Sequence, residues 1–144
     1  MNEASFWTKV RGAINAHPNG VAHKLTDMFT AGTPDALYCI RGHTGVLELK
    51  YVPKWPVRTG TEIAIELTEN QRAWMLDWIG KGLGSGFVLL GVAQEWFLLG
   101  VDEVPDYPVP RLPVQYLKGI TARGYGGTFR DLKSMLPACL ERLA

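Results

Sequence analysis

The chain has 144 residues, of which 47% are hydrophobic and 20% are charged, as is typical of a globular domain with a substantial core. Its net charge of only +1 excludes the overall basic field of many nucleic-acid-binding proteins, so a polyanion would have to be held by a local basic patch. No window contains the roughly 18 apolar residues needed to cross a bilayer, and no signal peptide is recognisable. We therefore expect a single domain over residues 1–144, located in the cytoplasm and without a membrane partner.

Hydrophobic spacing predicts a helix and a hairpin in the first third of the chain. Phe6, Val10 and Ile14 recur at helical spacing, which predicts a first helix within residues 2–16. Residues 36–41 and 46–52 are two apolar runs on either side of the glycines in RGHTG, a pattern typical of a β-hairpin. A short strand in GVAHKL would precede them.

The rest of the chain continues the alternation of helices and strands. Thr68 with Gln71 three residues later is a capping-box pattern and predicts the start of a second helix. Apolar runs over 86–101, broken at Ala93 and Gln94, predict two buried strands. The proline-rich segment 105–113 is expected to be irregular, and a C-terminal helix is expected at about 128–143. This order predicts an α/β domain whose central mixed sheet is flanked by helices on both faces.

The hairpin carries three charged residues that are unusual in an apolar strand sequence. Glu48 and Lys50 share one strand face, and Asp35 stands at the entrance of the hairpin. Two carboxylates on one face suit a hard divalent cation, and a neighbouring lysine could stabilise charge that develops on a phosphate. The trio therefore fits metal-assisted phosphodiester hydrolysis. The alternative is an ordinary salt bridge on a strand.

The position of the turn decides whether the two carboxylates meet. If the turn is centred on residues 43–44, Asp35 lies opposite Val52, about 13 Å from Glu48 along the strand. If it is centred on residues 41–42, Asp35 faces Glu48 at about 5 Å between Cβ atoms. The sequence leaves both registers open.

Five segments in this order resemble the PD-(D/E)XK nuclease superfamily, in particular its VRR-NUC and Holliday-junction-resolvase-like branch, which is often found in phages. They are GTPD at 32–35, LELK at 47–50, KYVPKWPVR at 50–58, LTENQRAW at 67–74, and EASFW at 3–7. The resemblance extends over roughly residues 3–99. It implies a restriction-endonuclease-like core and a divalent-metal-dependent DNA endonuclease that acts on branched, flapped or Holliday-junction DNA in the host cytoplasm. The alternative is a non-catalytic phage DNA-binding or packaging protein that retains the fold.

The resemblance also assigns roles to individual residues. Asp35 and Glu48 would be ligands of Mg²⁺ or Mn²⁺, with the backbone carbonyl of Leu49 as a third ligand. Lys50 would be the catalytic lysine. Gln71 would lie at the edge of the site, and an additional acid would come from the first helix, namely Glu3.

Basic residues near these motifs are expected to contact DNA phosphates, and a homodimer that presents two sites is expected from the resolvase resemblance. The residues expected to bind DNA are Lys9, Lys24, Lys54, Arg58 and Arg72. Trp74 and Trp78, four residues apart in the second helix, are expected to pack in the core instead of stacking on bases.

Overall fold

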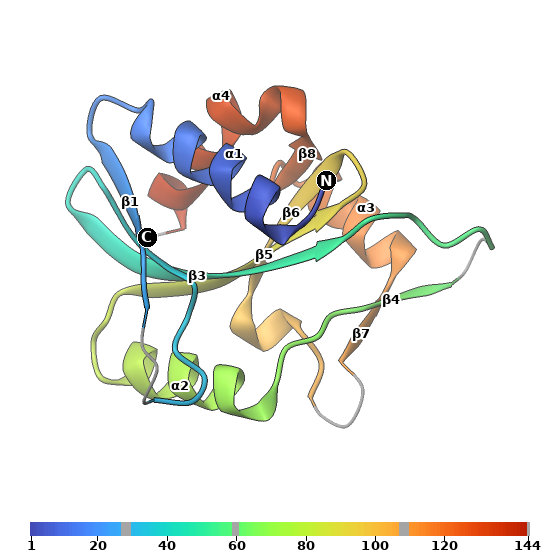
Figure 1. Cartoon of the computed structure of the whole chain (residues 1–144), viewed down its shortest axis with the longest axis horizontal. Coiled ribbons are helices and arrows are strands. Elements are labelled where there is room, and N and C mark those ends of the chain that lie inside the picture. The colour runs from blue at the N-terminus through green and yellow to red at the C-terminus, as the bar shows by residue number, and fades with distance from the viewer. Residues whose placement is uncertain (27–29, 59–60, 107–109, 144) are drawn as a thin grey trace.

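A computed structural model describes residues 1–26, 30–58, 61–106 and 110–143. Within these residues, six strands form a central mixed sheet in the order β1-β2-β3-β5-β6-β8 (Figure 1). Neighbouring strands are antiparallel except for the parallel pair β3 and β5. The strands are β1 (Gly20–Lys24), β2 (Ala36–Ile40), β3 (His43–Val52), β5 (Ser85–Val92), β6 (Glu95–Gly100) and β8 (Gly126–Thr128).

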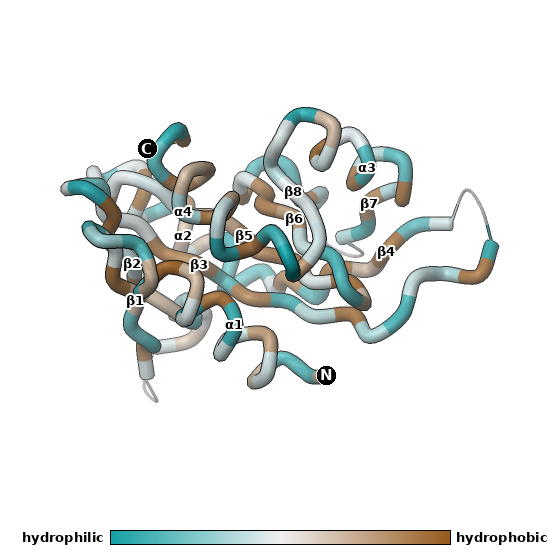
Figure 2. Tube along the Cα trace, turned by 90° about the horizontal axis from the view of Figure 1, so that it is seen from above, coloured by the Kyte–Doolittle hydropathy of each residue, from teal (hydrophilic) through white to brown (hydrophobic). Residues whose placement is uncertain are grey.

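Helices cover both faces of this sheet. On one face lie α1 (Glu3–Asn15) and α4 (Leu132–Arg142), which pack on Leu47 and Leu49 of β3 in one hydrophobic cluster. On the opposite face lie α2 (Glu69–Gly80) and α3 (Val114–Ala122), which contact apolar residues of β3, β5 and β6. The hydropathy of the trace shows the same arrangement, with hydrophobic residues gathered on the central strands (Figure 2). The expected α/β architecture with a mixed sheet flanked by helices is confirmed.

The first helix forms because its sequence supplies both a cap and an apolar stripe. The Asn2 side chain accepts a hydrogen bond from the Ser5 N–H at 2.9 Å, which satisfies one of the free donors at the start of α1. Phe6, Val10 and Ile14 are completely buried against the sheet. This burial places Glu3, in the first turn, at the edge of the sheet.

A two-residue turn fixes the register of the β2–β3 hairpin. Arg41 and Gly42 both have positive φ angles, 49° and 82°, as the tight turns of two-residue hairpins require. Ile40 then pairs with His43, and Ala36 with Leu47. The turn at residues 41–42 is therefore the one that forms, and the register with a turn at 43–44 is excluded.

The proline-rich region is more regular than expected. Arg111–Pro113 forms β7, which pairs with β4 (Glu62–Ala64) in a separate two-stranded sheet, and α3 begins directly after Pro113. Residues 107–109 of this region lie outside the described residues. After the strand at residues 126–128, a 3-10 helix at Phe129–Asp131 leads directly into the last α-helix, which begins at Leu132. Among the helices of the described ranges, none has the length and apolar character needed to cross a membrane.

Candidate active site

The β2–β3 hairpin places two carboxylates opposite each other. Since Ala36 pairs with Leu47, continuing the ladder by one step sets Asp35 opposite Glu48. The Asp35 Oδ2 accepts a hydrogen bond from the backbone N–H of Leu49 at 2.8 Å, which fixes the carboxylate against β3. Side chains directly opposite on antiparallel strands have Cβ atoms about 4.5–5.5 Å apart. The hairpin thus brings together the two acids that the sequence singled out.

The buried side chain of Glu48 has one carboxylate oxygen without a partner among the described residues. Its side chain is only 2% exposed, and its Oε2 has no hydrogen-bond partner among the described residues. Burial, together with the hydrogen bond and negative charge of Asp35, raises the pKa of Glu48 to about 9. Buried carboxylate oxygens are rarely left without a partner, so this oxygen indicates a place for a proton or a cation.

The carboxylate pair fits a magnesium-like cation in its chemistry. Oxygen donors are the ligands that hard divalent cations prefer, and Mg²⁺ commonly keeps several waters while it binds one or two carboxylates. No group of three or more His, Cys, Asp or Glu side chains within the described residues is arranged to hold a metal. A cation at Asp35 and Glu48 would therefore need backbone carbonyl or water oxygens to complete its coordination.

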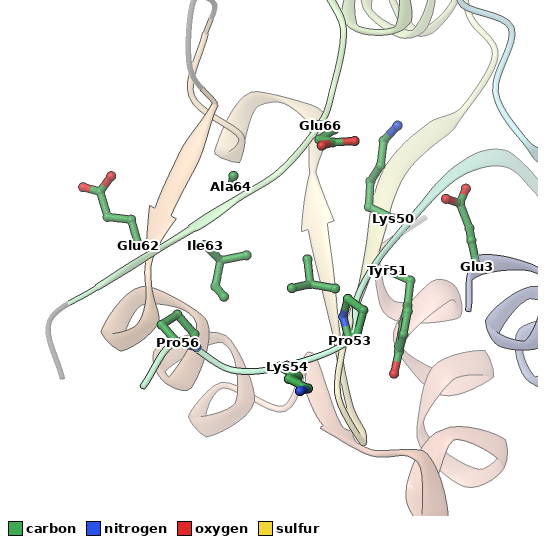
Figure 3. Close-up of a pocket in the computed structure, with 11 residues that line it drawn as sticks. Glu3, Lys50, Tyr51, Pro53, Lys54, Pro56, Glu62, Ile63, Ala64 and Glu66 are labelled. Carbon is green, nitrogen blue, oxygen red and sulfur yellow. The ribbon is translucent and has the colours of Figure 1, made fainter. Parts of the chain in front are cut away.

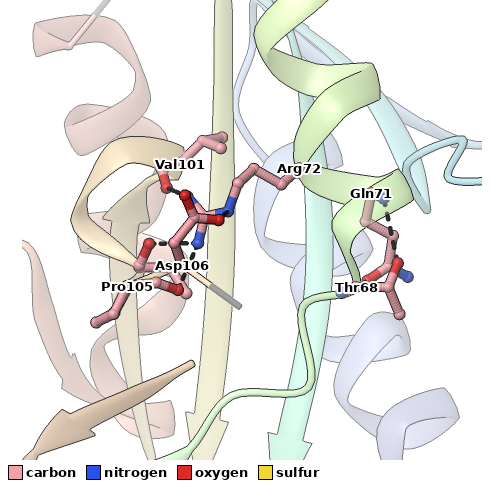
Figure 4. A network of polar contacts seen from close by, with 7 residues as sticks. Thr68, Gln71, Arg72, Val101, Pro105 and Asp106 are labelled. Atoms are coloured by element: carbon pink, nitrogen blue, oxygen red, sulfur yellow. Dashed lines mark hydrogen bonds and ion pairs between the residues drawn. The ribbon is translucent and has the colours of Figure 1, made fainter. Parts of the chain in front are cut away.

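Lys50 is held beside the pair by the second helix. Its Nζ donates a hydrogen bond to the Gln71 Oε1 at 3.1 Å. The same oxygen accepts the backbone N–H of Thr68 at 3.0 Å, and the Gln71 N–H donates to the Thr68 Oγ1 at 3.1 Å, which completes the expected capping box (Figure 4). Gln71 thus links the start of α2 to the lysine.

The loop that carries Asp35 packs closely against the start of α2. Gly32 has a φ of +86°, and a Cβ added there would lie 2.3 Å from the backbone oxygen of Asn70. Only glycine allows both this backbone conformation and this close approach. Gly32 therefore sets the distance between the Asp35 loop and the helix that holds Lys50.

Glu3 and Lys24 complete one side of the site. Together with Asp35 and Leu49 they line a small cavity of about 190 Å³. Burial, followed by the charge of Asp35, raises the pKa of Glu3, while Lys50 and Lys24 act in the opposite direction. The first helix therefore does bring an acid next to the hairpin, as the resemblance implied.

Glu66 is a site residue that the sequence interpretation missed. Glu66, Glu3 and Lys50 line a second cavity of about 440 Å³, and Figure 3 shows Lys50 with Glu66 on one side and Glu3 on the other. The signal was present in EIAIEL, residues 62–67, where large apolar residues alternate with two glutamates and an alanine. Ile63, whose side chain is buried, belongs to the inward set, and Glu66 belongs to the outward set.

The residues expected to bind DNA lie at different distances from this centre. Lys24 and Lys54 each line one of the two cavities. Arg58 is exposed on the segment between β3 and β4. Lys9 lies farther along α1, with its Nζ 5.9 Å from the centre of the Phe129 ring.

Arg72, which is also expected to bind DNA, makes several contacts within the chain. Its guanidinium donates to the backbone oxygens of Val101 at 3.1 Å, of Pro105 at 2.6 Å and of Val104, and it pairs with Asp106 at 3.3 Å (Figure 4). The side chain is only 13% exposed. These contacts hold the turn after β6 and occupy the guanidinium, so this geometry gives no support to the expected DNA contact of Arg72.

Comparison with known proteins supports the fold. The structure is similar to that of Hjc from Archaeoglobus fulgidus, described as a Holliday junction resolvase, with a TM-score of 0.56 and 11% sequence identity. The match covers 81% of this chain and 88% of the Hjc chain. No protein-family model matches the sequence, and a search of curated proteins gives no significant match. At this identity the likeness shows a shared fold and no more.

Proposed function

We propose that this protein is a divalent-metal-dependent DNA endonuclease of the PD-(D/E)XK type that acts on branched DNA. The observation that carries the proposal is the pairing of Asp35 with the buried, partly unsatisfied Glu48, beside a lysine held by Gln71. The fold shared with an archaeal Holliday junction resolvase supports branched DNA as the substrate class.

Each residue of the centre has a definite task in this proposal. Asp35, Glu48 and the Leu49 carbonyl would hold Mg²⁺ or Mn²⁺, which lowers the pKa of a bound water and neutralises charge on a phosphate. Lys50, held by Gln71, directs its ammonium group at the reacting phosphate and stabilises the charge that develops there. Glu3 lies across from Lys50 and orients water at the same place.

A local basic rim would compensate for the low net charge. Lys24 and Lys54 border the cavities at the centre, and Arg58 and Lys9 extend the rim to both sides. Phosphate contacts made by these four side chains would place the DNA backbone over the carboxylates. A homodimer would present two such centres, which suits a junction with two-fold symmetry.

The proposal is tested by incubating the purified protein with labelled duplex, flap and four-way-junction DNA in Mg²⁺, Mn²⁺ or EDTA. We expect cleavage of the branched substrates in both metals and none in EDTA. Asp35→Asn, Glu48→Gln and Lys50→Met should each reduce cleavage by at least about a hundredfold, because each removes a metal ligand or a charge partner. Lys118→Met, which changes an exposed lysine on α3, is the matched control. Tight DNA binding without any cleavage would instead identify a non-catalytic DNA-binding protein.

A further inference from the structure

Two tryptophans on α2 form an exposed aromatic stack. The rings of Trp74 and Trp78 are nearly parallel, with 12° between their planes and 4.7 Å between their centres. Trp78 is 49% exposed in spite of this contact, whereas Trp74 is partly buried against the hydrophobic cluster around Met75. The expectation that both pack in the core is therefore wrong for Trp78.

The stack borders a cavity of about 580 Å³ that adjoins the candidate active site. Leu37 on β2 and Val46 on β3 form part of its wall. Side chains two residues apart on a strand share a face, so Leu37 lies on the face of Asp35, and Val46 on the face of Glu48. Each of these two apolar residues is two positions along its strand from a carboxylate residue, a distance of about 7 Å. This distance is about twice the rise between nucleotides along one DNA strand.

The lining of this cavity favours a neutral and flat ligand. Leu25, Leu83 and the two indole rings supply apolar surface. Of the described residues that line it, none is basic, and the carboxylate of Asp77 at one side pairs with Lys81, which is outside the lining, at 2.9 Å. A phosphate group would find no basic partner in this lining. An aromatic base has two apolar faces for an indole, and amino groups that can donate to a carboxylate.

We propose that this cavity binds an unpaired nucleobase of the DNA substrate, one or two nucleotides from the phosphate at the carboxylate pair. This inference rests on the proposed nuclease function and narrows its substrate to DNA with unpaired nucleotides beside the cut, such as a flap or an open junction. A base that is paired and stacked in a duplex cannot enter without being extruded, which costs a few kcal/mol. Substrates with a free base avoid that cost.

Binding measurements with a matched pair of DNA probes test this inference. One probe is a flap carrying 2-aminopurine in its unpaired arm, and the other is a fully paired duplex of equal length, both measured in Ca²⁺ to prevent cleavage. Trp78→Ala should weaken binding of the flap by roughly five- to a hundredfold and leave duplex binding unchanged, because one stacking contact is lost. The wild-type protein should also quench 2-aminopurine fluorescence, and Trp78→Ala should not.

Two further variants separate base stacking from a general effect on α2. Leu76→Ala changes a side chain of the same helix that is 48% exposed and does not line the cavity, so it should bind both probes normally. Trp78→Phe keeps an aromatic face and should restore most of the flap affinity. Equal losses on flap and duplex, a loss with Leu76→Ala, or no loss with Trp78→Ala would overturn the inference.

Two additional measurements keep this inference separate from the proposed function. If Trp78→Ala alters the mass of the DNA-free protein in light scattering, the surface is an interface between copies and the base-binding inference is overturned. If the wild-type protein does not cleave DNA but still binds flaps through Trp78, the nuclease proposal fails and the base site remains. If metal-dependent cleavage occurs without any role for Trp78, only the base site is overturned.

Discussion

Lys50 and Thr68 donate to the same oxygen of Gln71, at 3.1 Å and 3.0 Å respectively. One side chain therefore caps α2 and positions the lysine of the candidate active site. Lys50 belongs to β3, but its position depends on the first turn of α2.

Two substitutions of Gln71 should separate its effect on stability from its effect on cleavage. Gln71→Ala removes the acceptor of Lys50 and the reciprocal cap, so we expect about 1 kcal/mol lower stability and roughly tenfold slower cleavage. Gln71→Glu keeps an acceptor for the Thr68 N–H and should preserve stability, but it pairs Lys50 with a carboxylate and should still slow cleavage. Urea unfolding and single-turnover cleavage measure the two effects.

Thr68 provides the control for this experiment. Thr68→Ser retains the hydroxyl that accepts from the Gln71 N–H and should leave both stability and cleavage near wild type. If Gln71→Glu cleaves at the wild-type rate, Gln71 serves the helix alone.

Glu48 should make the metal-free protein less stable as the pH rises. The folded-state pKa of Glu48 is raised to about 9 from an ordinary value of 4.5, so the folded protein retains a proton that the unfolded chain has released between these values. This contribution is complete below pH 4.5 and is lost as the pH approaches 9, by at most about 1.4 kcal/mol per pH unit. Urea unfolding in EDTA at pH 5, 7 and 9 measures it.

Glu48→Gln and added Mg²⁺ are the comparisons for the pH experiment. The glutamine variant cannot ionise, so its stability should decline less over the same range. Mg²⁺ should stabilise the wild-type protein most at pH 9, because it binds the ionised pair. Identical pH profiles for the wild-type protein and the Glu48→Gln variant would show that Glu48 does not titrate in this range.

Gly32→Ala should destabilise the protein by roughly 1–3 kcal/mol. The added Cβ would meet the Asn70 backbone at 2.3 Å in a backbone conformation that alanine avoids. Gly12→Ala is the control, since that Cβ has nothing within 4 Å and lies in a helix, where it should stabilise slightly. Thermal unfolding of both variants checks the prediction, which fails if Gly32→Ala unfolds at or above the wild-type temperature.

Arg72→Met should lower stability and leave DNA binding almost unchanged. The substitution leaves the backbone oxygens of Val101, Val104 and Pro105 without their charged donor, and hydrogen bonds to charged groups contribute about 1.5–3 kcal/mol each. Thermal unfolding and fluorescence anisotropy with duplex DNA measure the two properties. A normal unfolding temperature together with weakened DNA binding would restore Arg72 to the DNA-binding set.

Lys54→Glu combined with Arg58→Glu should weaken binding to DNA of any sequence and reduce the salt dependence. Each lost phosphate contact lowers the slope of log affinity against log salt by about 0.9 on duplex DNA. The charge-matched control is Lys118→Glu with Lys133→Glu, which reverses two exposed lysines on α3 and α4. Anisotropy titrations at several salt concentrations give the slopes. An equal change in both double variants would indicate a non-specific charge effect.

The sequence predicted the elements whose hydrophobic period is unbroken. The helix at Phe6 and Val10 and the two strands that meet at Ala93 formed as expected, because burial of one stripe or run determines them. The prolines of residues 105–113 predict irregular structure, so the sequence pattern does not reveal β7 or the start of α3. Pro113 is tolerated at the end of a strand in a two-stranded sheet and immediately before the first turn of a helix, where the missing N–H costs little.

In the candidate site, too, features set by nearby residues could be predicted, and features set by residues far away in the chain could not. Strand parity placed Asp35, Glu48 and Lys50 on one face, but the register depended on whether residues 41–42 or 43–44 formed the turn. The environment of Arg72 could not be anticipated, since its acceptors are backbone oxygens some 30 residues away along the chain. The capping role of Gln71 could be predicted, because the capping box is a local pattern, whereas its place at the edge of the site was implied only by the family resemblance.

The parallel pairing of β3 with β5 also determines when the candidate active site can exist during folding. The hairpin that carries Asp35 and Glu48 can form from residues that are close in the chain. Lys50 meets Gln71 only when α2, which lies in the connection from β3 to β5, has packed against the sheet. Closing that crossover is a non-local step and is slow compared with hairpin formation. If the proposed nuclease function holds, a newly synthesised chain would have its carboxylates in place before its lysine, and cleavage would begin only after the central strands have joined.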